Sequence, residues 1–136
     1  MTPALANLYQ ERILAHHRKP HHFGPLPEAT MHKTLRNPLC GDEVTLHLQV
    51  EHNTIVRCHF EGEGCMLCRA SASMLTDWVA GKSLEQARKR AAVLVAFLES
   101  GGDGMAGEEL GELVVFSGVR EHPSRVKCVS LPWHAL

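Results

Sequence analysis

Three cysteines and one aspartate of this chain lie in short segments that are rich in small or rigid residues. They are Cys40, Asp42, Cys65 and Cys128. Three thiolates and a carboxylate are sufficient ligands for one tetrahedral zinc ion. A thiolate is also the nucleophile in sulfur exchange. The sequence therefore indicates a metal site, sulfur chemistry, or both.

The local sequence of two of these segments favours a shared metal site. Gly41 separates Cys40 from Asp42 and relaxes the backbone, so both side chains can reach the same ion. Cys65 precedes a helical pattern, and the free amides and dipole at a helix N-terminus favour a thiolate over a thiol. Both segments can therefore supply metal ligands.

Cys128 follows two basic residues, Arg125 and Lys127. Three thiolates and one carboxylate around Zn²⁺ carry a formal charge of about −2, so nearby cations are needed. We expect Arg125 and Lys127 to supply this charge and to favour the Cys128 thiolate. The spacings of the three cysteines match no zinc finger, so the residues alone leave ordinary buried thiols as an equal alternative.

Length and composition narrow the class of protein. A chain of 136 residues, 44% hydrophobic and 21% charged, is expected to fold as one domain over residues 1–136. A net charge of −1 gives no electrostatic case for binding nucleic acid or an anionic membrane. No apolar run has the length of a membrane span and no export signal is visible, so we expect a cytoplasmic protein. The odd number of cysteines, 5, then favours metal or thiol chemistry over disulfides.

Hydrophobic periodicity predicts strands in the first half of the chain and helices around and after them. Residues 44–51 alternate as a half-buried strand, residues 52–53 are a tight turn, and residues 56–60 alternate as the returning strand. Residues 107–119 are a short helix or turn. Helices are predicted at residues 3–18, from Cys65 to about Ala80, from a capping box at Ser83 and Gln86, and from Pro123, where the helix should kink or loosen at Pro132. This order favours an α+β fold.

The residues around the cysteines carry a family resemblance. The motifs are Asn37-Pro38-Leu39-Cys40-Gly41-Asp42, Gly62-Glu63-Gly64-Cys65, Ala70-Ser71-Ala72-Ser73-Met74-Leu75-Thr76 and Val126-Lys127-Cys128. With these motifs the sequence resembles the IscU/NifU-type iron–sulfur cluster assembly proteins from Leu8 to Leu136, and it is most similar to their SufU branch. Each motif alone is suggestive, whereas the combination is highly specific.

Two features favour the SufU branch. Lys127 stands where IscU relatives carry a histidine before the last cysteine, and residues 101–120 match an insertion of SufU relatives. Residues 122–127 also lack the proline-rich chaperone-recognition motif of the IscU branch. We therefore expect no dedicated chaperone of the IscU type.

The resemblance implies a small three-stranded antiparallel sheet packed with helices, including a strand near Thr30–Leu35 that the alternation does not mark. It implies that Cys40, Asp42, Cys65 and Cys128 bind zinc. A SufS-type cysteine desulfurase is then expected to donate persulfide sulfur, with Cys40 as the acceptor. Because a carboxylate is a harder ligand than a thiolate, Asp42 is expected to make the site exchangeable.

Two other functions remain open. One is a scaffold on which a [2Fe–2S] cluster forms on Cys40, Cys65 and Cys128 before transfer to apoproteins or other carriers. Lys127 disfavours it, because lysine is a poor cluster ligand at neutral pH. The other is a non-catalytic zinc module, or a redox protein that uses the CxxC motif of residues 65–68.

Several other side chains are interpreted as structural. Cys68 is favoured as a packed neighbour of the site over a redox partner, and Cys58 as a core residue. Trp133 is left equally open as a packing anchor or a partner contact. Solvated side chains are expected at His16, His17, His21, His22, Glu108, Glu109 and Glu112, and core packing at Met74, Leu75 and Trp78.

Overall fold

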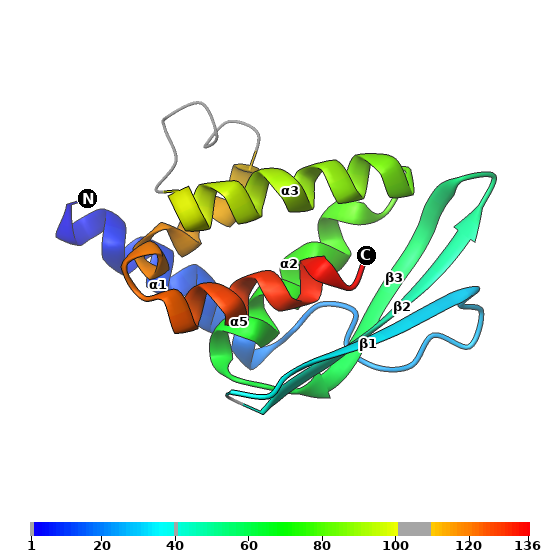
Figure 1. The fold of residues 1–136 in the computed structure, drawn as a ribbon, viewed down its shortest axis with the longest axis horizontal. Helices are drawn as coiled ribbons and strands as arrows, with labels where there is room; N and C mark the ends of the chain where they lie inside the picture. Colours follow the sequence, from blue (N-terminus) through cyan, green and yellow to red (C-terminus); the bar gives the residue numbers. More distant parts are fainter. Residues whose placement is uncertain (1, 40, 101–109) are drawn as a thin grey trace.

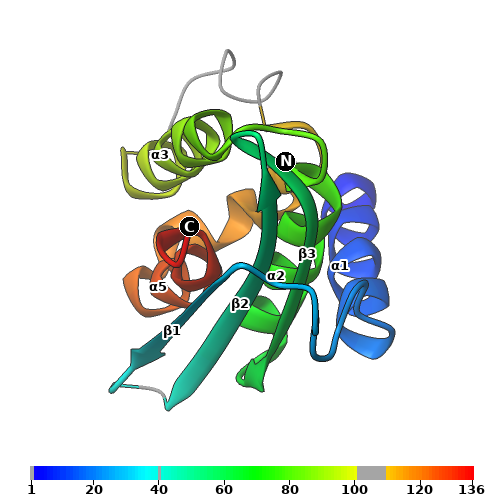
Figure 2. The same cartoon turned by 90° about the vertical axis from the view of Figure 1, so that its right-hand side faces the viewer.

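The computed structural model describes residues 2–39, 41–100 and 110–136. Its elements are α1 (Pro3–Arg18), β1 (Met31–Asn37), β2 (Asp42–Glu51), β3 (Thr54–Glu63), α2 (Met66–Val79), α3 (Leu84–Ser100), the 3₁₀ helix η1 (Gly111–Glu121) and α5 (Pro123–His134). The strands form one antiparallel sheet in the order β1-β2-β3. The helices gather on one side of this sheet (Figure 1, Figure 2). The predicted α+β class and three-stranded sheet are confirmed.

The β2–β3 hairpin forms where the alternating pattern predicts it. Val44, Leu46 and Leu48 are buried on the helix-covered face, with at most 3% of each residue exposed. His52 and Asn53 connect the strands with φ angles of 50° and 62°. Two consecutive left-handed residues match the right-handed twist of a hairpin, and both residue types tolerate that conformation.

The predicted helix starts are also confirmed. Pro3 is at the first position of α1, and the Thr2 side chain accepts a hydrogen bond from the Leu5 amide at 3.1 Å. At the start of α3, Ser83 and Gln86 bond to each other's backbone amides, as a capping box requires. α5 begins at Pro123 and continues through Pro132 to His134, so the proline does not end the helix.

Helix α2 is the centre of the core, packed against α1, α5 and β3. Met74 and Leu75 are buried in it and Trp78 packs against the same cluster, as predicted. Trp133, 1% exposed, is a packing anchor from α5. Its indole N–H donates to the Ser71 hydroxyl at 3.1 Å, and that hydroxyl donates to the Val129 carbonyl at 2.6 Å. One α2 serine thus joins two positions of α5.

Ser71→Ala is expected to lower the free energy of unfolding by about 1–3 kcal/mol, because it leaves the buried indole N–H of Trp133 without its acceptor. Urea denaturation of the two single variants and of the double variant with Trp133→Phe measures this. The loss on Ser71→Ala should be smaller in the Trp133→Phe background, where no indole N–H remains. Equal losses in both backgrounds would contradict the coupling.

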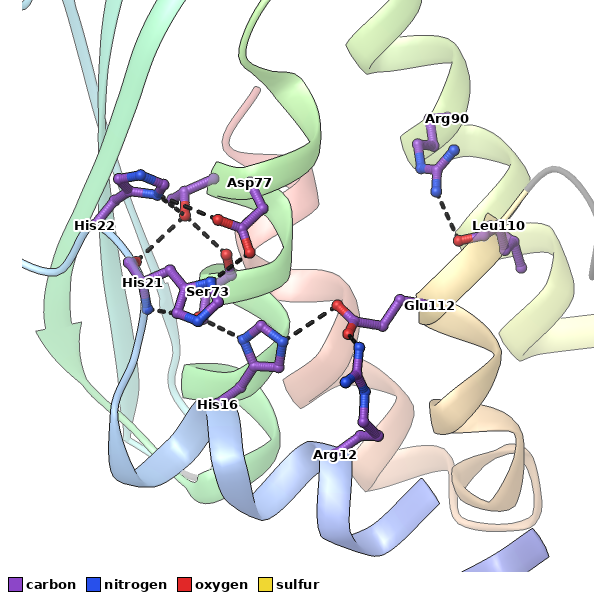
Figure 3. Close-up of polar contacts among 10 residues, drawn as sticks. Arg12, His16, His21, His22, Ser73, Asp77, Arg90, Leu110 and Glu112 are labelled. Carbon is purple, nitrogen blue, oxygen red and sulfur yellow. Dashed lines mark hydrogen bonds and ion pairs between the residues drawn. The ribbon is translucent and has the colours of Figure 1, made fainter. Parts of the chain in front are cut away.

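The prediction of a solvated side chain is wrong for His16, whereas Glu112 is partly exposed, at 29% of its side chain. His16 is 6% exposed, and its Nε2 lies 3.2 Å from Glu112, which also pairs with Arg12 (Figure 3). Burial lowers the pKa of His16 in spite of the adjacent carboxylate. Glu108 and Glu109 lie outside the described residues. His21 and His22 are about half exposed, yet both contact Asp77.

None of the described helices is long and apolar enough to cross a lipid bilayer. The strand expected near Thr30–Leu35 is present as β1, over Met31–Asn37. The short helix or turn expected at 107–119 corresponds in its described part to η1, which continues to Glu121. Residues 107–109 of that prediction are not among the described ones.

Candidate metal centre

Three of the four predicted ligands come together from three different elements. Asp42 is the first residue of β2, Cys65 is the N-cap residue of α2, and Cys128 is in the second turn of α5. One ligand atom of each lies within 4.8 Å of the other two. Cys40 lies outside the described residues. Asp42 pairs with Asn37 across the β1–β2 ladder, so β2 begins two residues before the strand predicted from residue 44.

The Asp42 carboxylate has two separate contacts with the Cys65 segment. Its Oδ1 accepts a hydrogen bond from the Cys65 backbone N–H at 2.8 Å, and its Oδ2 lies 3.7 Å from the Cys65 Sγ. Asp42 is 2% exposed, whereas Cys65 is exposed. One oxygen therefore positions the start of α2, while the other is presented to the sulfur.

The separation of these atoms suits a zinc ion. Bonds of about 2.3 Å to sulfur and about 2.0 Å to oxygen place two ligands of a tetrahedral zinc ion about 3.5 Å apart. The 3.7 Å between Asp42 Oδ2 and Cys65 Sγ is close to that value. Thiolates and a carboxylate are also zinc's usual sulfur and oxygen ligands. The donor set therefore fits the ion in both type and separation.

Two glycines let the chain approach closely enough to form this site. Gly62 has a φ of 137°, and a Cβ there would lie 2.1 Å from the Glu43 carbonyl oxygen. A Cβ at Gly64 would lie 3.1 Å from Asp42 Oδ1. The Gly-x-Gly-Cys sequence is thus explained by backbone conformation at its first residue and by contact with the carboxylate at its third.

Burial and the other two candidate ligands determine the electrostatics of Cys128. Burial raises the pKa of this thiol, and hydrogen bonding and charge from Asp42 and Cys65 raise it further. Arg125 and Lys127 are exposed on α5. Neither residue is among the causes of this shift, so the expectation that they favour the Cys128 thiolate stays a prediction. Acidic groups that converge in this way are stabilised together by a metal cation.

The remaining cysteines are packed side chains. Cys58 is 2% exposed on β3, and burial raises the pKa of its thiol to about 12, as expected of an inert core residue. Cys68 is 3% exposed within the hydrophobic core. It lies beside the site, since a Cβ at Gly64 would meet the Cys68 Cβ at 3.3 Å. The interpretation of Cys68 as a packed neighbour is confirmed.

Sequence reasoning missed the second role of Asp42, its bond to the Cys65 amide. It also missed a second group of converging donors, which His16, His21 and Asp77 form between α1 and α2. The signal available for that group was the pair of adjacent histidines at 16–17 and again at 21–22, which the sequence analysis assigned to solvent.

Comparison with known proteins gives consistent results. Residues 8–129 match the NifU-like N-terminal domain. The chain is 38% identical to the iron–sulfur cluster assembly scaffold protein IscU of Streptococcus pyogenes serotype M1, over 97% of this chain and 82% of that protein. It is 33% identical to the zinc-dependent sulfurtransferase SufU of Bacillus subtilis (strain 168), over 97% and 88% respectively.

A solved structure shares the fold. The crystal structure of an iron–sulfur cluster assembly scaffold protein for the SUF system, from Fervidobacterium islandicum AW-1, superposes with a TM-score of 0.82 at 30% identity. The match covers 92% of this chain and 90% of that one. The match to the domain family, the two sequence relatives and this structure agree over nearly the whole chain. The chain therefore belongs to the family of NifU-like N-terminal domains, together with the IscU and SufU proteins.

Proposed function

We propose that this protein acts in iron–sulfur cluster assembly as a zinc-dependent acceptor and carrier of sulfur from a cysteine desulfurase. The observation that carries the proposal is the convergence of Asp42 with the sulfurs of Cys65 and Cys128. The relative named a zinc-dependent sulfurtransferase supports it. A reducing compartment such as the cytoplasm, where thiols stay free, suits this chemistry.

Asp42, Cys65 and Cys128 would hold the zinc ion, with Cys40 as the fourth ligand. Bound zinc keeps its cysteine ligands deprotonated near neutral pH, which the buried Cys128 thiol would not achieve alone. Asp42 contributes a harder and weaker ligand than a fourth thiolate. The protein therefore stores reactive thiolates in a site whose ligands can exchange.

The sulfur step takes place on Cys40. Its thiolate attacks the terminal sulfur of the desulfurase's cysteine persulfide, and a new S–S bond forms on Cys40. The S–S bond of the donor breaks, and the desulfurase cysteine leaves as a thiolate. The persulfide proton stays with the transferred sulfur, so the exchange needs no oxidant or reductant. The product is a Cys40 persulfide for delivery to the assembly of clusters.

A second candidate is a scaffold that holds a [2Fe–2S] cluster as cargo on Cys40, Cys65 and Cys128 and passes it to apoproteins. The relative named an IscU scaffold, 38% identical, favours it. Lys127 next to the last cysteine counts against it, because a protonated lysine has no lone pair for iron. The two candidates use the same thiolates and differ in what occupies the site.

Cys40→Ala is expected to abolish sulfur acceptance, because it removes the proposed acceptor thiolate while Cys65 stays bound to zinc and Cys58, Cys68 and Cys128 are buried. The purified zinc form is incubated with a SufS-type desulfurase and cysteine, and the gain of one sulfur atom per chain is followed by mass spectrometry. Cys68→Ala is the control and should accept sulfur as the wild type does, because Cys68 is buried.

Sulfur acceptance by Cys40→Ala at the wild-type rate would show that the acceptor assignment is wrong. Anaerobic incubation of the wild type with iron and sulfide separates the two candidates. A stable cluster absorption spectrum with stoichiometric loss of zinc would support the scaffold and contradict the sulfur carrier.

A further inference from the structure

A second group of converging donors lies between α1, the loop after it and α2. Single ligand atoms of His16, His21 and Asp77 lie within 4.8 Å of one another (Figure 3). Asp77 follows Cys65 by nearly the whole length of α2, which at 1.5 Å per residue separates the two positions by about 18 Å. This group, the histidine cluster, is therefore distinct from the cysteine site.

The hydrogen bonds of His16 fix how its ring is presented. Its Nε2 lies 3.2 Å from a carboxylate oxygen of Glu112, which can only accept, so this nitrogen carries the proton. Its Nδ1 lies 2.7 Å from the Ser73 hydroxyl. Because the neutral ring carries its proton on Nε2, Nδ1 accepts from the Ser73 hydroxyl, whose oxygen also accepts the His21 backbone N–H at 2.8 Å. The Nδ1 lone pair therefore points at the Ser73 hydroxyl, which a metal ion would have to displace.

This arrangement is typical of a metal-binding histidine. Such ligands usually donate their second ring N–H to a carboxylate, which fixes the tautomer and the orientation of the ring. Glu112 has that position behind His16, and Arg12 holds Glu112 in turn. His16 itself is buried, at 6% exposed, whereas the side chains of Glu112 and Arg12 behind it are 29% and 58% exposed.

The front of the cluster is open to solvent. His21 Nδ1 lies 2.5 Å from one oxygen of Asp77, and His22 Nδ1 lies 3.5 Å from the other. The side chains of His21 and Asp77 are 51% and 38% exposed. The rings of His16 and His21 are 4.6 Å apart between centroids. An ion can therefore enter from solvent and reach two imidazoles and a carboxylate with small side-chain movements.

We propose that His16, His21 and Asp77 bind a divalent transition-metal ion such as Zn²⁺ or Fe²⁺, with His22 available as a fourth ligand. Two imidazole nitrogens and one carboxylate oxygen suit these ions, and the lack of sulfur separates the site chemically from the cysteine site. The bound ion would join α1 and the following loop to α2. It would replace the hydrogen bond from Ser73 to His16.

Cobalt(II) is the probe that distinguishes the two sites in one titration. Cobalt bound by thiolates gives strong charge-transfer absorption in the near ultraviolet, whereas cobalt bound by nitrogen and oxygen gives weak visible bands alone. The wild-type chain is expected to bind two equivalents, one of each kind. If the proposed zinc site fails, the charge-transfer band is absent while the second equivalent still binds, so the two proposals fail separately.

His21→Ala and Asp77→Asn should each weaken the nitrogen–oxygen equivalent at least tenfold and leave the thiolate equivalent unchanged. The matched control is His52→Asn, which removes an exposed imidazole from the β2–β3 turn and suits the φ of 50° there. It should bind both equivalents like the wild type. Circular dichroism of each variant checks that the fold is retained.

Cobalt also shifts the ring-proton NMR signals of histidines that bind it, and this readout needs no substitution. Paramagnetic shifts are expected for His16 and His21 of the wild type, but not for His52. A wild type that binds cobalt at thiolates alone would overturn the proposal. So would a nitrogen–oxygen equivalent that survives both substitutions, or unshifted His16 and His21 signals at saturation.

Discussion

Replacing Asp42 with asparagine is expected to weaken zinc binding at least about tenfold. The unfolding free energy of the metal-free protein, measured in the presence of a chelator, should change by less than about 1 kcal/mol. Asparagine keeps an oxygen that can accept the hydrogen bond from the Cys65 N–H, which lies 2.8 Å from Oδ1 of Asp42. It replaces the second oxygen, 3.7 Å from the Cys65 sulfur, with an amide that only donates. The substitution therefore removes the ligand and keeps the positioning bond.

Asp42→Ala is expected to lose both functions of the carboxylate. Zinc binding should fall as in the asparagine variant, and the unfolding free energy in chelator should fall by about 1–3 kcal/mol, since the Cys65 amide loses its acceptor. Competition with a chromophoric chelator gives the zinc affinity, and urea denaturation gives the stability. The difference between the two variants measures the positioning role alone.

Glu43→Gln is the matched control for charge. Glu43 is the next residue, and its carboxylate pairs with Arg36 at 2.6 Å on the surface. Surface pairs of this kind contribute about 0–1 kcal/mol, so this variant should bind zinc like the wild type. If Asp42→Asn kept the wild-type zinc affinity, Asp42 would only position Cys65, and the proposed ligand set would be wrong.

The elements that sequence could predict are those with one buried face. β2 shows alternation because Val44, Leu46 and Leu48 pack beneath the helices while their neighbours are more exposed. β1 shows no such pattern, because this edge strand is exposed along most of its length and joins the sheet through its ladder with β2. A strand without a buried face leaves no period of two in the sequence. Only the family resemblance predicted the position of β1.

Some features of the candidate site could likewise be predicted from local sequence, and others could not. Cys65 could be placed at a helix start from local residues, and the glycines before it indicated an unusual backbone. Its meeting with Cys128 could not be derived locally, because it depends on how α5 packs against α2 and the sheet. His16 was misjudged for the same reason: its partner Glu112 is 96 residues away in the chain. Polarity predicts exposure only when no distant partner is present.

Gly62→Ala is expected to lower the unfolding free energy by about 3–5 kcal/mol. An added Cβ would lie 2.1 Å from the Glu43 carbonyl oxygen and 2.9 Å from its carbon, and these are backbone atoms of the paired strand. No side-chain rotation relieves that contact, so the β2–β3 ladder has to open. Overpacking and an unfavourable φ each cost about 1–3 kcal/mol, and here they add.

Gly24→Ala separates the two costs. Gly24 has a φ of 130°, close to the 137° of Gly62, but an added Cβ there meets nothing within 4 Å. Urea denaturation of both variants should show Gly62→Ala to be at least about 2 kcal/mol less stable than Gly24→Ala. Equal losses would mean that backbone conformation, not the approach of the strands, requires glycine at position 62.

The same substitution also tests how the sheet positions the metal ligands. Gly62 lies opposite Val44 in the ladder. Val44 is two residues after Asp42 in the chain, and Cys65 is three residues after Gly62. Opening the ladder there should separate Asp42 from Cys65, so zinc binding should weaken in Gly62→Ala and remain normal in Gly24→Ala. A destabilised Gly62→Ala protein that still bound zinc normally would show that the metal assembles its ligands without the ladder. Gly62 would then serve stability alone.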